Sequence, residues 1–283
     1  KARDKKTNLK KLSVILILKL LIIIIICSNI IKLEIHPIIK KHLNEVNFKI
    51  NYNFNNFDNR KNILIVGNSY ADDLLNILLN NEKLNNQYYF YTAKSDLNSV
   101  SYQIPCFKEF LLKRKIYCEK NSFAFLTKQY EKSDFIIFAE LFNRKTYLNS
   151  EFEEVIKILD RDKKKFIIIL DDFTLAPLVL DNYLYKKQKI PSLYELNNLE
   201  KNSFQEMINF KKRNSIKVIE NKLLKMKSQY LTRSELFCDY VIKKCFLMKN
   251  DNKIYKDFGH ITNFGANYFS VKGKLIMEKL ENN

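Results

Sequence analysis

Two short segments, one near each end of the folded part of the chain, hold side chains that could carry out nucleophilic chemistry. The first, GNSYADDL, places Ser69 directly after an apolar run; the second, DFGHITNFGANYF, holds Asp257 and His260. A serine hydroxyl is a poor nucleophile until a base removes its proton, and histidine is the commonest such base. A carboxylate beside the imidazole orients the ring and stabilises its charged form. The residue types therefore favour a nucleophilic site built from Ser69, His260 and Asp257.

Each of these residues also has a simpler explanation. Ser69 begins a helical pattern, and serine is common at helix N-caps. His260 could be an ordinary surface-loop histidine. The chain has only 3 His, however, and His36 and His42 lie beside an apolar N-terminal segment. A Ser–His mechanism in the folded region must therefore use His260, and the Ser69 backbone N–H, at a helix N-terminus, could stabilise an oxyanion.

The elements that must position these residues alternate between two patterns. Short apolar runs that predict buried strands occur at 62–67, 88–93, 134–140 and 165–170. Apolar residues at helical spacing predict helices after Ser69 and at 151–160, 202–230 and 265–280. This alternation predicts a three-layer α/β/α sandwich with a mostly parallel sheet. Ligands of such sheets bind at the carboxyl ends of the strands, where Ser69 is expected to lie.

Composition excludes several classes of protein. The 283 residues are 46% hydrophobic and 28% charged, which excludes disorder over most of the chain, and 4 Gly with 4 Pro exclude a collagen-like repeat. The net charge of +18 permits binding to an anionic polymer, but the lysines are scattered and no nucleic-acid-binding motif accompanies them. We predict no nucleic-acid partner, no metal and no cofactor. The carboxylate pair Asp171 and Asp172, after the fourth strand, favours a solvated loop or helix cap over a metal site.

The N-terminal part of the chain predicts a membrane anchor. Residues 12–31 form an apolar run, interrupted by Lys19, that is long enough to cross a hydrocarbon core of about 30 Å. Residues 1–11 are strongly basic, so the positive-inside rule places them in the cytoplasm. Residues 32–60 are then a polar linker, and 61–283 form an extracytoplasmic domain. A cleaved signal peptide is the alternative.

The cysteines agree with an oxidising compartment. Outside the apolar run they form two pairs that are close in sequence, Cys106 with Cys118 and Cys238 with Cys245, which predicts two short-loop disulfides. The alternatives are four free thiols or a zinc site made of all four cysteines, although neither pair has the CxxC spacing of zinc knuckles.

The two catalytic segments resemble those of a known family. GNSYADDL is similar to the first block of SGNH hydrolases, and DFGHITNFGA to their last block, Asp-x-x-His. The longer stretch CDYVIKKCFLMKNDNKIYKDFGHITNFGA resembles the SGNH domain fused to membrane acyltransferases of family 3. Asn68 departs from the Asp that is usual after Gly67. The Gly and Asn blocks that complete the oxyanion hole in SGNH esterases are not evident, and Asn143 is the candidate for a second donor, with Asn98 weaker.

The resemblance implies a function. Ser69 would carry an acyl group, most simply acetyl, as an acyl-enzyme, and His260 would act as general base while Asp257 holds the imidazole. A bundle of membrane helices would deliver the acyl group, and a cell-surface glycan hydroxyl would accept it, as in polysaccharide O-acetylation. A periplasmic hydrolase with the same triad, a catalytically silent glycan-binding domain and a basic anchored polymer-binding protein are the alternatives.

Overall fold

The computed structural model describes residues 60–92, 104–113, 120–139, 150–174, 176–214, 216–257 and 259–282. All of these residues belong to one unit of the chain, Asn47–Asn283. The predicted anchor at 12–31, the basic segment at 1–11 and all of the predicted linker at 32–60 except Arg60 lie outside the described residues. Within the described part, no helix combines the length and the apolar character needed to cross a membrane.

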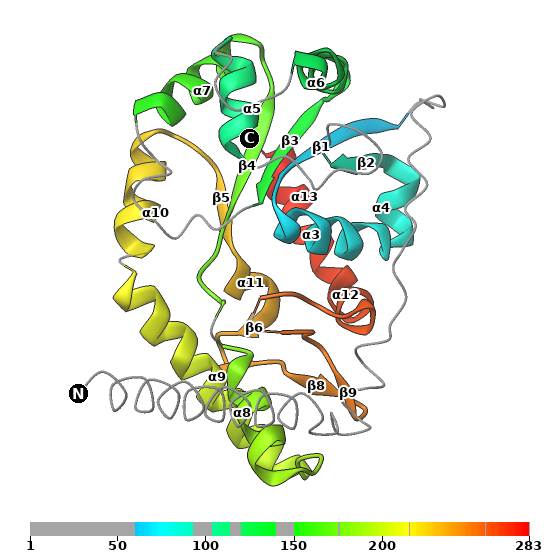
Figure 1. Cartoon of the computed structure of the whole chain (residues 1–283), viewed down its shortest axis with the longest axis vertical. Helices are drawn as coiled ribbons and strands as arrows, with labels where there is room; N and C mark the ends of the chain where they lie inside the picture. The colour runs from blue at the N-terminus through cyan, green and yellow to red at the C-terminus, as the bar shows by residue number, and fades with distance from the viewer. Residues whose placement is uncertain are drawn as a thin grey trace, which may run out of the picture. The chain divides into compact units, whose positions relative to one another are not determined.

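Five parallel strands form the central sheet, with helices packed against it (Figure 1). They are β1 Lys61–Gly67, β2 Tyr88–Thr92, β3 Phe135–Ala139, β4 Lys165–Leu170 and β5 Tyr230–Thr232. Their spatial order is β2-β1-β3-β4-β5, and each neighbouring pair is parallel. The predicted α/β architecture is therefore confirmed. The sequence missed β5, because three residues are too few to produce a periodic pattern.

The helices follow the strands along the chain. They are α3 Ser69–Leu79, α4 Glu82–Gln87, α5 Ile104–Leu111, α6 Lys120–Lys132, α7 Ser150–Arg161, α8 Leu178–Lys187, α9 Leu193–Arg213, α10 Ile216–Lys225, α11 Arg233–Phe237, α12 Asn263–Phe269, the 3₁₀ turn η2 Ser270–Lys272 and α13 Gly273–Glu281. Residues 202–230, predicted to be helical, divide between α9, α10 and β5. The predicted last helix is broken at η2 into α12 and α13.

Alternate residues of each strand supply two separate cores, one on each face of the sheet. In β1, Ile63 and Ile65 pack into a core that also holds residues of α3, α12 and α13. Leu64 and Val66 point to the other face, where residues of α5, α6, α7 and α10 cover them. Side chains of a strand alternate between faces, so a strand that is apolar throughout must be covered on both sides. This pattern produces the three layers.

A small β region lies between β5 and α12. It contains two hairpins, formed by β6 Cys238–Asp239 with β7 Lys244–Cys245 and by β8 Met248–Lys249 with β9 Asn252–Lys253. Cys238 and Cys245 form a disulfide across the first hairpin, which confirms one of the two predicted pairs. The pair of Cys106 and Cys118 lies outside the described side chains and remains a prediction. The chain then continues through residues 254–262 into α12, and this segment carries Asp257 and His260.

Candidate active site

Ser69 lies at the carboxyl end of β1, where the chain turns into α3. Gly67 makes this turn possible, because a Cβ atom at that position would lie 1.8 Å from the carbonyl oxygen of Ala139 on β3. Asn68 is the N-cap of α3, and its Oδ1 accepts a hydrogen bond from the backbone N–H of Tyr70 at 3.0 Å. The capping function that could have explained Ser69 is thus performed by Asn68. The exposed hydroxyl of Ser69 is left for another partner.

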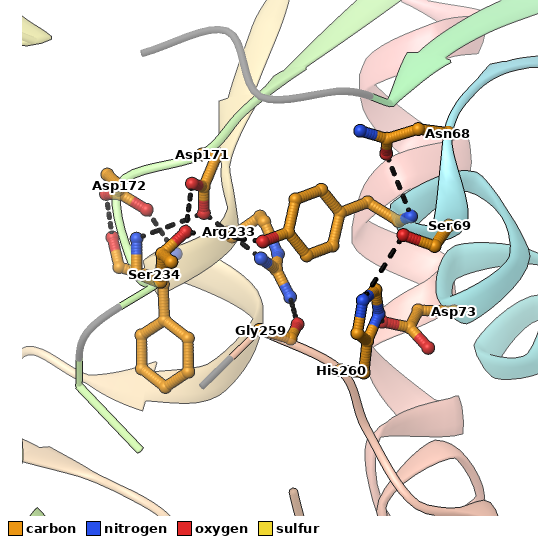
Figure 2. Close-up of polar contacts among 12 residues, drawn as sticks. Asn68, Ser69, Asp73, Asp171, Asp172, Arg233, Ser234, Gly259 and His260 are labelled. Atoms are coloured by element: carbon orange, nitrogen blue, oxygen red, sulfur yellow. Dashed lines mark hydrogen bonds and ion pairs between the residues drawn. The ribbon is translucent and has the colours of Figure 1, made fainter. Parts of the chain in front are cut away.

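That partner is His260, which lies 191 residues further along the chain. Its Nε2 is 3.2 Å from Ser69 Oγ, and Figure 2 shows the ring directed at the hydroxyl. The His260 side chain is 28% exposed, so a small molecule can reach the pair from solvent. The two sequence blocks therefore meet as predicted, and the distance permits proton transfer between hydroxyl and imidazole.

The other ring nitrogen of His260 contacts a carboxylate on α3. Nδ1 lies 2.9 Å from Oδ2 of Asp73, whose residue is only 9% exposed. Asp73 follows Ser69 by four residues on the same helix, so the two side chains lie on one face about one turn apart. With Nδ1–H donating to the carboxylate, Nε2 carries the lone pair that can accept the Ser69 proton.

Asp73 also determines the basicity of the imidazole. The hydrogen bond to Asp73 raises the pKa of His260 above its ordinary value, whereas burial and Arg233 act in the opposite direction. Burial raises the pKa of Asp73 itself, and the hydrogen bond from His260 opposes this effect. The pair therefore favours a proton on the ring once the ring has accepted one.

Asp257 makes different contacts. Its Oδ1 accepts hydrogen bonds from the backbone N–H groups of Gly259 and His260, at 2.8 and 2.9 Å. A further bond of 2.8 Å, from the Lys256 N–H to the His260 carbonyl, closes the loop. The negative charge of Asp257 contributes to the raised pKa of His260, but the contact at Nδ1 goes to Asp73. The predicted role of Asp257 in holding the ring stays a prediction.

A buried arginine, Arg233, binds the loop that carries His260. Arg233, 4% exposed, donates from Nη2 to the Gly259 carbonyl at 2.5 Å and from Nη1 to Asp171 at 3.0 Å. Its guanidinium also lies over the Tyr70 ring, 4.1 Å from the centroid, and the Tyr70 and His260 rings are 5.2 Å apart. Arg233 thus connects α11 to the residues on either side of the Ser69–His260 pair, as Figure 2 illustrates.

Asp171 and Asp172 are fully buried, which corrects the interpretation that they form a solvated pair. Asp171 binds Arg233, and Asp172 pairs with Lys211 at 3.0 Å and accepts from the Ser234 N–H at 2.8 Å. The contact with Ser234, in the first turn of α11, matches the helix-capping part of that interpretation. The correction has a simple cause: the sequence does not reveal the distant cations that make burial of both carboxylates possible.

The remaining predicted donors cannot be placed. Asn143 and Asn98 lie outside the described residues, so the second oxyanion donor stays a prediction. Among the described residues no group of three or more His, Cys, Asp and Glu could hold a metal ion. Sequence analysis overlooked Asp73 and Arg233. Helical spacing from Ser69 was an available signal for Asp73, whereas nothing in the sequence distinguishes Arg233 from other basic residues.

Comparisons with known proteins give a family match and a similar solved structure. Residues 42–270 match the family described as SGNH domain (fused to AT3 domains), which covers most of the chain. The chain belongs to this SGNH family. A search of solved structures finds similarity to the periplasmic domain of a Salmonella ser. Paratyphi A lipopolysaccharide acetyltransferase, with a TM-score of 0.47 and 16% identity over 78% of this chain and 85% of that chain. A search of curated proteins gives no match.

Proposed function

We propose that this SGNH domain is an acyltransferase that forms an acyl-enzyme on Ser69 and passes the acyl group to a hydroxyl acceptor. The observation that carries the proposal is the 3.2 Å contact between Ser69 Oγ and His260 Nε2, at the carboxyl end of a central strand. Family membership supports the same chemistry. The exposure of Ser69 is consistent with an acceptor larger than water.

In the first half of the reaction, Ser69 Oγ attacks the carbonyl carbon of the acyl donor while Nε2 of His260 takes the hydroxyl proton. The carbonyl oxygen becomes an oxyanion, which the Ser69 backbone N–H at the positive end of α3 can stabilise. Asn143 is the proposed second donor. The intermediate then collapses, the donor's leaving group departs with the proton from the imidazolium, and the acyl group remains as an ester of Ser69.

In the second half, an acceptor hydroxyl replaces the leaving group. Nε2 of His260 removes its proton, the acceptor oxygen attacks the ester carbonyl, and Ser69 leaves with the proton returned by the imidazolium. The acceptor proposed from the sequence resemblance is a cell-surface glycan, and the acyl group is acetyl or a similar small group. None of these steps requires a redox change.

The proposed setting is extracytoplasmic. Residues 12–31 anchor the chain, 1–11 face the cytoplasm, 32–60 link the anchor to the domain at 61–283, and a membrane acyltransferase bundle delivers the acyl group. The association of this family with AT3 domains supports a membrane partner. The Cys238–Cys245 disulfide is consistent with an oxidising compartment such as the periplasm.

The test uses a fluorophosphonate probe, which reacts covalently with activated serines. The wild-type chain should be labelled, while Ser69→Ala and His260→Ala should not be labelled and should keep the wild-type circular dichroism spectrum. An unlabelled wild-type protein, or labelling that persists in Ser69→Ala, would contradict an acyl-enzyme. The first of these outcomes would favour a silent glycan-binding domain.

Transferase and hydrolase are separated by a product assay. With p-nitrophenyl acetate as donor, addition of an oligosaccharide acceptor should divert acetyl groups from free acetate to the sugar, detected by mass spectrometry. Free acetate as the sole product with a range of acceptors would support the hydrolase instead. A basic polymer-binding protein would show salt-sensitive binding to anionic polymers that is unchanged in Ser69→Ala.

A further inference from the structure

We propose that Asp73, and not the Asp257 of the terminal sequence block, is the carboxylate that orients the His260 imidazole. Asp257 would instead fix the backbone of the loop that presents the ring. The inference deepens the proposed function and rests on it, since orientation matters only if His260 acts as a base. In this proposal Asp73 bonds the ring of His260, and Asp257 bonds the main chain of the loop.

The first argument is the hydrogen bonding of the two carboxylates. Asp73 Oδ2 lies 2.9 Å from Nδ1, the ring atom that must carry a hydrogen if Nε2 is to accept the Ser69 proton. Asp257 Oδ1 receives two backbone N–H groups, from Gly259 and His260, within a loop closed by a further backbone bond. These bonds hold the loop in shape, whichever tautomer the ring adopts.

The second argument is where the two groups are attached. Asp73 lies on α3, and the burial of its side chain restricts its rotamers. Asp73 therefore shares a rigid helix with the nucleophile, and one turn of helix fixes its distance from Ser69. Asp257 lies on the same loop as His260, so a movement of that loop carries both residues together. A carboxylate that positions the ring against Ser69 is more effective when it belongs to the element that carries Ser69.

The charged groups around the His260 ring determine how removal of each carboxylate should change the pKa of His260. Asp73 on α3 and Asp257 on the loop both raise the pKa of His260, whereas Arg233 on α11 lowers it. The uncharged Tyr70 packs against the ring. Loss of Asp73 removes a direct hydrogen bond and a charge, whereas loss of Asp257 removes a charge without a ring contact. Both changes should lower the pKa of His260, and the change at Asp73 should lower it more.

The experiment compares Asp73→Asn with Asp257→Asn in the whole chain. Asn keeps the shape of Asp but can present its amide N–H to Nδ1, which stabilises the unproductive tautomer. We expect Asp73→Asn to slow fluorophosphonate labelling of Ser69 by about 10²- to 10⁴-fold at neutral pH. Asp257→Asn should slow it by less than about 10-fold while lowering the melting temperature. Asp72→Asn, the same charge change at the preceding position of α3, is the matched control and should label at close to the wild-type rate.

A second readout requires no reaction. NMR titration of the imidazole resonances, assigned to His260 with a His260→Gln variant, should give a lower pKa in Asp73→Asn than in Asp257→Asn. The proposal is overturned if Asp257→Asn causes the larger fall in pKa and in labelling rate while Asp73→Asn stays near wild type. If the wild-type protein does not react with the probe, the proposed function fails, and the titration still decides which carboxylate holds the ring.

The comparison does not depend on Asp73→Asn folding. If that variant unfolds, Asp257→Asn alone decides. Labelling within about 10-fold of the wild-type rate, with the midpoint of the pH profile moved only slightly to lower pH, supports Asp73. Loss of labelling in a folded protein refutes the proposal.

Discussion

The Gly259 carbonyl, directly before His260, accepts a 2.5 Å hydrogen bond from the guanidinium of Arg233. Arg233 is buried and pairs with the buried Asp171, so one cation supports the loop before His260 and neutralises a carboxylate at the end of β4. Arg233 therefore ties the loop that presents the proposed base to the end of β4.

Replacement of this cation should cost both stability and reactivity. Arg233→Met leaves Asp171 buried without its partner, and breaking a buried pair in this way costs about 3–5 kcal/mol. Urea unfolding should report this loss, and Ser69 labelling should slow because the Gly259–His260 backbone loses its anchor. Arg233→Lys retains the charge but not the two-pronged geometry, so it should recover part of the stability. Wild-type stability in Arg233→Met would show that the pair does not matter.

Gly67 should not tolerate a methyl group. In Gly67→Ala the new Cβ would meet backbone of β3, with the Ala139 carbonyl oxygen 1.8 Å away, so β1 and β3 would have to separate. We expect a loss of at least about 1–3 kcal/mol or failure to fold, measured by thermal unfolding. Gly273→Ala is the control, because the nearest atom there is the flexible Leu84 Cδ1 at 3.0 Å. Equal effects of the two changes would contradict the close approach of the strands.

The rate of Ser69 labelling should increase with pH. The hydrogen bond to Asp73 raises the pKa of His260 above 6.5, so the neutral imidazole that can accept a proton forms at a higher pH than in a free histidine. The midpoint of the labelling profile should therefore lie above pH 6.5, and it should move to lower pH in Asp73→Asn. A wild-type midpoint below 6.5 would contradict the pairing.

The same shift predicts how stability depends on pH. A group whose pKa is raised by folding binds protons more tightly in the folded state. The extra stabilisation that protonated His260 gains beside Asp73 should be complete below pH 6.5 and should disappear as pH rises through the folded-state pKa of His260. The difference in unfolding free energy between wild type and His260→Gln, measured as a function of pH, checks the sign.

Loss of the Cys238–Cys245 disulfide should destabilise the domain. The bridge spans seven positions in sequence, and a loop of this size corresponds to about 2–3 kcal/mol in the chain-entropy model. A Cys238→Ser/Cys245→Ser variant should therefore unfold at a lower urea concentration than the oxidised wild type. Thiol titration of the oxidatively expressed, denatured protein provides the control, and free thiols at both positions would contradict the bridge.

The sequence predicted those features that depend on a short stretch of residues or on a repeating pattern. Short apolar runs such as those within 62–67 and 165–170 favour buried strands covered on two faces, so the sheet and its layers were predictable. The Ser69–His260 pairing was predictable because the folded region offered a single histidine. Both inferences used information contained in a short window or in a count of residue types.

The sequence did not predict contacts between residues that are far apart in the chain. Asp257 was chosen as the partner of the ring because it is close to His260 in the chain, yet the carboxylate at Nδ1 comes from position 73. The burial of Asp171 and Asp172 depends on Arg233 and Lys211, which are far away in sequence. β5 consists of three residues, and its place at the edge of the sheet depends on pairing with β4.

Because Ser69 and Asp73 occupy successive turns of α3, two of the three groups in the proton path form a unit that cannot change its internal spacing. The position of His260 relative to that unit depends on the loop that carries the histidine. Displacement of this loop away from α3 would lengthen the Ser69–His260 contact while leaving the spacing between Ser69 and Asp73 unchanged.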